Sequence, residues 1–104
     1  MKLAGSRIDN IDDSPCVSLT FDDGGVIVTK RVKISCTATE TARAKRAFVQ
    51  EARYLIVKAA REARMDAAYS RYGKNWREHL DKVDVADLPK EQIRQAVTLL
   101  MEVA

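Results

Sequence analysis

The sequence is poor in the residues that build most catalytic and metal sites. It has one histidine, His79, and two cysteines, Cys16 and Cys36, which lie far apart and form no CxxC motif. Neither a P-loop nor a GxGxxG motif is present, and the pair Gly24–Gly25 is typical of a turn. These absences disfavour zinc binding, nucleotide binding and cysteine–histidine catalysis. We therefore expect a protein that is not an enzyme and that uses no metal ion or cofactor.

Proline, glycine and long apolar runs are also scarce. The 104 residues include only two prolines and four glycines, and no apolar run approaches the roughly 18 residues that a membrane span needs. Residues 1–7 lack the apolar centre of a signal peptide. The sequence predicts a single cytoplasmic domain over residues 1–104, with no membrane partner and no small-molecule substrate.

The scarcity of helix breakers is most pronounced in residues 38–72, which contain neither glycine nor proline and are followed by Gly73. Thr37 and Glu40 have the spacing of a capping box, so we expect the helix to start at Ala38. Such a helix is about 52 Å long, whereas a compact domain of this size is only about 33 Å across. The helix must protrude, bend or pack against a second copy of the chain.

Residues 16–36 have the pattern of a β-hairpin. Val17, Leu19 and Phe21 alternate with polar residues, and residues 22–25 (Asp-Asp-Gly-Gly) form a strong turn signal. With a four-residue loop there, Phe21 pairs with Val26 and the two cysteines stay apart, which excludes a disulfide across the hairpin. Lys30, which falls among the apolar residues of the second strand, indicates a bulge or a sheet edge.

The remaining segments complete the predicted fold. Residues 1–15 are expected to be either flexible or, over residues 3–8, a short edge strand. Residues 75–82 predict a short helix, and residues 89–103 an amphipathic helix. The predicted class is α+β: an N-terminal β-hairpin, or three short strands, followed by a long central helix, a short helix and a C-terminal amphipathic helix.

Arginines of the long helix gather on one side. At 100° per residue four of them fall on one line and two flank it, and two further cations follow Gly73; the eight residues are Arg43, Arg46, Arg53, Arg61, Arg64, Arg71, Lys74 and Arg77. Residues 38–80 carry a net charge of +5, against +3 for the whole chain. This arginine ridge is open to three interpretations: a solvated face, a contact with nucleic-acid phosphates, or a contact with an acidic protein surface.

The opposite side of the same helix is rich in alanine. Small side chains let another helix approach closely, and we therefore expect an oligomer interface at Ala52, Leu55, Ala59 and Ala63. Three aromatic residues, Tyr69, Tyr72 and Trp76, surround Gly73. They predict either a small core at the corner between two helices or a platform on which unpaired bases stack.

These observations favour a small, oligomeric interaction protein that binds an anionic partner through the arginine ridge. The first candidate for the partner is the backbone of a nucleic acid. The alternative is a protein-binding adaptor or inhibitor, of the kind common among accessory proteins of phages and mobile elements, that docks on an acidic protein surface.

Overall fold

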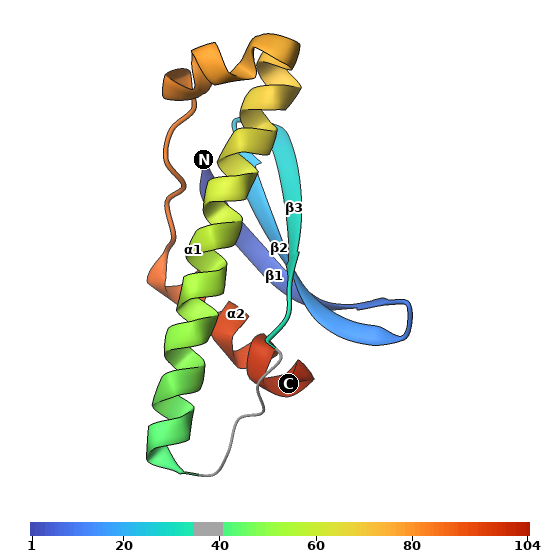
Figure 1. Ribbon diagram of the computed structural model, residues 1–104, viewed down its shortest axis with the longest axis vertical. Helices are drawn as coiled ribbons and strands as arrows, with labels where there is room; N and C mark the ends of the chain where they lie inside the picture. Colours follow the sequence, from blue (N-terminus) through green and yellow to red (C-terminus); the bar gives the residue numbers. More distant parts are fainter. Residues whose placement is uncertain (35–40) are drawn as a thin grey trace.

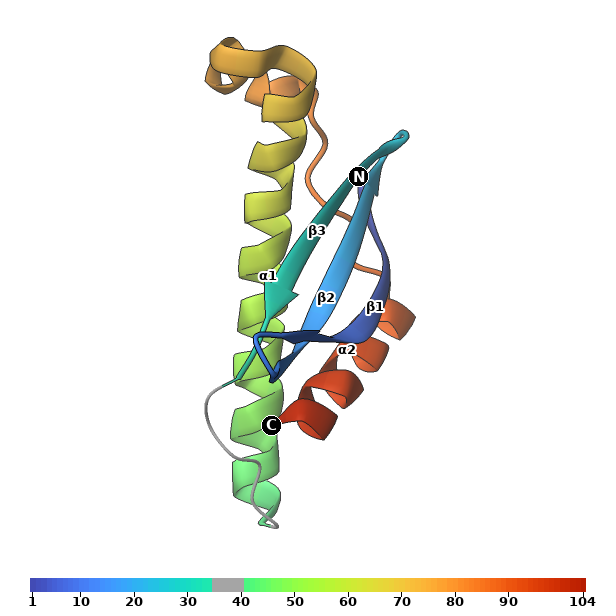
Figure 2. The ribbon, with the colours of Figure 1, turned by 90° about the vertical axis from the view of Figure 1, so that its right-hand side faces the viewer.

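The protein is built from two layers, a β-sheet and a pair of helices that cover one face of it (Figure 1). The structure is a computed structural model and describes residues 1–34 and 41–104. Figure 2 shows the other face of the sheet, over which no described helix lies. The α+β class predicted from the sequence is therefore confirmed.

The sheet has three antiparallel strands in the order β1–β2–β3. Strand β1 spans Lys2–Ile11, β2 spans Ser14–Asp23 and β3 spans Val26–Val32. Of the two expectations for the N-terminal segment, the edge strand is the one observed, and it is longer than predicted. The β1–β2 turn places Asp12 and Asp13 in the left-handed region of the backbone, which aspartate tolerates better than most residues.

The predicted register of the hairpin is wrong by two residues. Phe21 pairs with Val28, and Asp23 pairs with Val26, so only Gly24 and Gly25 form the loop. Both glycines have positive φ, which two-residue hairpin loops require. Because the shift is an even number, the same side chains still face the core. Cys16 is buried and has no disulfide among the described residues, and Cys36 lies outside them.

Lys30 lies on an edge strand, one of the two alternatives predicted for it. Its ammonium group pairs with the carboxylate of Asp66 on the long helix, which compensates the charge on the packed side of the sheet. The apolar part of this side includes Leu19 and Phe21, both fully buried, and Val28.

Helix α1 spans Ala42–Tyr72 and begins four residues later than predicted. Thr41 has an extended backbone and accepts a hydrogen bond from the amide of Ala44 at 3.2 Å, as an N-cap does. The cap predicted at Thr37 and Glu40 lies outside the described residues. At the other end Gly73 has a φ of 63°, which terminates the helix.

After Gly73 the chain turns into a 3-10 helix, η1, which spans Gly73–Lys82 and includes a non-helical Asn75. Tyr72 and Trp76 are half-buried against the hydrophobic core, which accords with a packed corner. Tyr69 points away from this corner and is 59% exposed.

Residues 83–89 form an extended strap that leads to helix α2, which spans Lys90–Val103. Pro89 takes the N-cap position, one residue before the helical position predicted for it. Helix α2 packs on β1 and β2, whereas α1 packs mainly on β3. Ala96 and Leu100 provide the buried part of its predicted apolar stripe.

The length of α1 is accommodated by protrusion. The molecule measures 47 × 28 × 20 Å, and the N-terminal turns of α1 extend beyond both the sheet and α2 (Figure 1). Most side chains between Ala42 and Ala47 are accordingly exposed. A single chain can therefore hold this helix without a second copy.

Candidate functional site

The arginine ridge is divided by the fold. Arg64 is only half exposed because it holds the corner between α1 and η1. Its Nε donates to the carbonyl of Val83 at 2.8 Å, and one terminal nitrogen donates to the carbonyl of Leu80 at 2.9 Å. The carbonyl of Leu80 also accepts from the amide of Val83 at 3.1 Å, whereas no other described residue donates to the carbonyl of Val83. Arg64 is thus bound within the chain.

Arg71 is also bound within the chain. Its Nε lies 3.0 Å from a carboxylate oxygen of Asp23, and a terminal nitrogen donates to the backbone carbonyl of the same residue. This contact fastens the β2–β3 turn to the C-terminal end of α1. Two of the four arginines on the predicted line are therefore structural.

The other predicted cations of α1 remain on the surface. Arg43, Arg46, Arg53 and Arg61 are exposed, and none of them has an ion pair or hydrogen bond with a described residue. Lys74 and Arg77 lie on η1, at the far end of the molecule from Arg43. Arg77 stacks on the ring of Trp76, with 5.2 Å between its guanidinium carbon and the ring centroid. The ridge is therefore two separate groups of cations.

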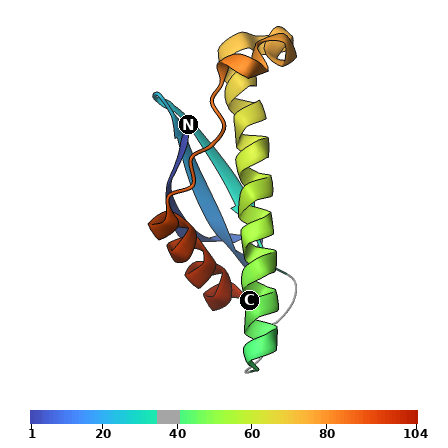
Figure 3. The ribbon, with the colours of Figure 1, turned by 90° about the vertical axis from the view of Figure 1, so that its left-hand side faces the viewer.

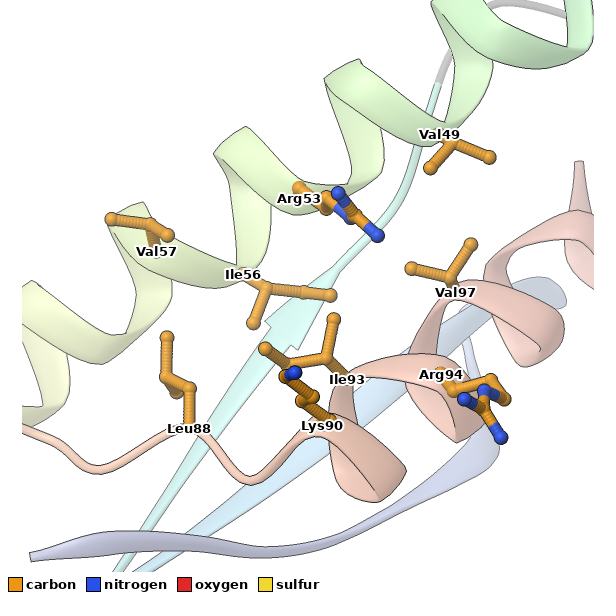
Figure 4. Close-up of a pocket in the computed structure, with 9 residues that line it drawn as sticks. All are labelled: Val49, Arg53, Ile56, Val57, Leu88, Lys90, Ile93, Arg94 and Val97. Carbon is orange, nitrogen blue, oxygen red and sulfur yellow. The ribbon is translucent and has the colours of Figure 1, made fainter.

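A groove runs along α1 on the side that faces α2 and the strap. Its first section has a volume of about 670 Å³, with apolar residues from α1 on one wall and from α2 and the strap on the other (Figure 4). The apolar lining consists of Val49, Ile56, Val57, Leu88, Ile93 and Val97. The second section, about 460 Å³, shares Val57 and Leu88 with the first and continues between α1 and the strap. We call the two sections together the α1 groove.

The charged residues of the α1 groove are all basic. Arg53 from α1 and Lys90 and Arg94 from α2 line the first section, and Arg61 and Arg64 line the second. Arg94 has an exposed partner, Glu91, at 3.5 Å, whereas Arg53, Arg61 and Lys90 have none among the described residues. Among the described residues, no carboxylate lines either section. The groove therefore combines a largely apolar lining with uncompensated positive charge.

The alanine face is covered by the chain itself. Ala52, Ala59 and Ala63 are at most 3% exposed within a single chain, and Leu55 is half-buried against the same core. These side chains are part of the chain's own hydrophobic core, to which the sheet and α2 also contribute. A second subunit would have to use a different surface from the interface predicted at these residues.

The polar groups elsewhere give little sign of a reactive centre. His79 stacks on Tyr72, with 4.6 Å between the ring centroids, at the packed corner. On the uncovered sheet face Ser18 donates a hydrogen bond to Asp9 at 2.5 Å, and this bond, with the nearby Arg7 and Arg31, lowers the pKa of the Asp9 carboxyl. Within residues 1–34 and 41–104 no cluster of three histidine, cysteine or acidic side chains is placed to hold a metal ion.

The sequence did not predict the side of the α1 groove that α2 contributes. Lys90 and Arg94 were not among the predicted site residues, because nothing local in the sequence places α2 beside α1. The apolar stripe of α2 was visible, but two of its members, Ile93 and Val97, are only partly buried against the core and also line the groove. The sequence did offer one signal for this side of the groove: an amphipathic helix with Lys90 and Arg94 next to its apolar stripe.

Comparison with known proteins adds no information about function, because no protein family, curated protein or solved structure matches this chain. The described helices include none with the length and hydrophobicity that crossing a bilayer requires.

Proposed function

We propose that the protein is a non-enzymatic binding protein, and that the α1 groove receives an acidic, partly apolar segment of another protein. The observation that supports this most directly is the lining of the groove by described residues: it is largely apolar, has basic residues from both α1 and α2, and has no carboxylate. Exposed apolar patches bounded by polar residues are typical of protein-binding surfaces. An acidic partner would neutralise Arg53, Arg61 and Lys90 while its apolar side chains contact Val57 and Leu88.

Binding of a nucleic-acid backbone is the second candidate. It is favoured by Arg43, Lys45 and Arg46, which lie on the protruding end of α1 outside the groove. The first turn of α1 contains no acidic residue, so this end is positive both in its side chains and in its backbone dipole. Against this candidate, Arg64 and Arg71 are bound internally and cannot continue a row of phosphate contacts. An apolar floor also has no role in binding phosphates.

The two candidates are separated by two variants and two probes. The probes are a fluorescent 12-residue peptide of glutamate and leucine and a 20-base-pair DNA duplex, each titrated at 50 and 200 mM salt. We expect Val57→Asp to abolish peptide binding, since it places a carboxylate on the groove floor, and Arg43→Ala to leave it unchanged. Val57 is 39% exposed, so the variant should fold.

The opposite pattern would reverse the ranking. If the duplex binds and the peptide does not, with loss of affinity in Arg43→Ala and none in Val57→Asp, the partner is a nucleic acid. In that case the slope of log affinity against log salt concentration should become shallower by about one for each phosphate contact that the variant loses.

A further inference from the structure

The strap is joined to β1 by a single β-bridge. The amide of Asp87 donates to the carbonyl of Met1 at 2.8 Å, and the amide of Leu3 donates to the carbonyl of Asp87 at 2.9 Å. These two bonds make a parallel bridge between Lys2 and Asp87. Both backbone groups of Asp87 are therefore used on the side that faces β1.

The neighbouring backbone groups face the other way. In an extended chain alternate residues direct their N–H and C=O groups to opposite edges, so those of Ala86 and Leu88 point away from β1. Neither residue has a hydrogen bond with any described residue. Pro89 restricts Leu88 to an extended conformation, which keeps this edge in a form that a further strand can join.

This open edge lies within the α1 groove. Figures 2 and 3 show the strap running beside helix α1 from η1 to α2. Ala86 and Leu88 line the second section of the groove together with Val57, Arg61 and Met65 of α1. Main-chain donors and acceptors with no partner among the described residues thus border the second section of the groove, which has a volume of about 460 Å³.

We propose that the occupant of the α1 groove binds as an extended strand that pairs with Ala86 and Leu88 of the strap. This rests on the proposed function and specifies its mode. Main-chain hydrogen bonds would supply affinity, and alternate side chains would enter the groove. The occupant is therefore a segment in which apolar and acidic residues alternate, with the apolar ones toward Val57 and Leu88.

The charges around the open edge of the strap favour the binding of acidic segments over basic ones. Arg61 lies on the α1 wall beside the strap, and Lys90 follows the strap at the start of α2. No described residue neutralises either of them. Since no described acidic residue lines the groove, a basic strand would find no partner among these residues, whereas carboxylates at alternate positions would reach cations on both sides.

The test uses two synthetic peptides of identical composition, glutamate and leucine in equal number. In one they alternate, as an extended strand requires, and in the other they follow the i, i+3, i+4 pattern of an amphipathic helix. Binding is measured by fluorescence anisotropy against the wild type, Ala86→Pro and Asp84→Pro. Proline at position 86 removes an N–H that the free protein leaves unpaired, whereas Asp84 is exposed and lines neither section of the groove.

We expect the alternating peptide to bind more tightly, Ala86→Pro to weaken its binding about tenfold or more, and Asp84→Pro to leave it within about twofold. On binding, the amides of Ala86 and Leu88 should become protected from hydrogen exchange. Preference for the helical peptide, unaffected by Ala86→Pro, would overturn the strand mode and leave the proposed function intact. If neither peptide binds a folded wild type, both proposals are wrong.

Discussion

Replacing Arg64 tests whether this arginine is structural or part of a binding surface. Arg64→Ala removes two hydrogen bonds from a charged donor, at 2.8 and 2.9 Å. It leaves the carbonyl of Val83 without a donor among the described residues, whereas the carbonyl of Leu80 keeps the amide of Val83. A hydrogen bond to a charged group contributes about 1.5–3 kcal/mol, and the partial exposure of the corner places the loss for the pair near 2–3 kcal/mol. For a domain of this size the melting temperature should fall by about 10 °C or more.

The measurement is urea and thermal unfolding followed by circular dichroism, with Arg61→Ala as the matched control. Arg61 lies one turn earlier on α1, is exposed and has no partner among the described residues, so its removal should change the free energy of unfolding by less than about 0.5 kcal/mol. Arg64→Lys should fall between the two, because an ammonium group cannot reproduce the fork of donors. Equal stabilities of Arg64→Ala and Arg61→Ala would refute the structural role.

Three further predictions concern other parts of the fold. The Asp9 carboxyl, whose charged form is stabilised first by Ser18, should titrate below its ordinary pKa of 3.8 in an NMR titration. Its contribution to the free energy of unfolding is then present above about pH 4 and lost as the pH falls through the lowered pKa. Asp9→Asn should remove this pH dependence. Gly73→Ala should cost about 1 kcal/mol in urea unfolding, because the position has a φ of 63° but open space around it, and a neutral result would exclude strain at the end of α1. Ala63→Arg should unfold the chain, with loss of helical circular dichroism, since it buries an unpaired charge against the chain's own core; a folded variant with an altered oligomeric state would instead restore the predicted oligomer interface.

The parts of the fold that depend on local pattern were predictable. The end of α1 at Gly73 and the core side of β3 follow from residue type and spacing alone. The start of α1 was misplaced because two threonines, Thr37 and Thr41, can each act as a cap, and the pattern does not choose between them. The register of the hairpin was misjudged because Asp22 and Asp23 favour turns, yet both lie in the strand.

The site was less predictable because its geometry comes from contacts distant in sequence. Helical spacing placed Arg53 and Arg64 on one line, but it could not show that Arg64 meets two carbonyls of a later segment. The same holds for the groove, which exists only because the strap returns along α1 to Asp87 and positions Lys90. Such contacts are set by topology and have no signature in the residues around them.

The bridge between Lys2 and Asp87 bears on the order in which the chain folds during synthesis. Strand β1 is made first, but its edge is completed by the strap and its packed face is covered mainly by α2, the last helix. The apolar side of Leu3, only 1% exposed in the folded protein, must therefore stay uncovered until about a hundred residues have left the ribosome. Contacts that span so much of the sequence slow folding, so the nascent β1–β2 hairpin is the part of this protein that most needs protection from aggregation.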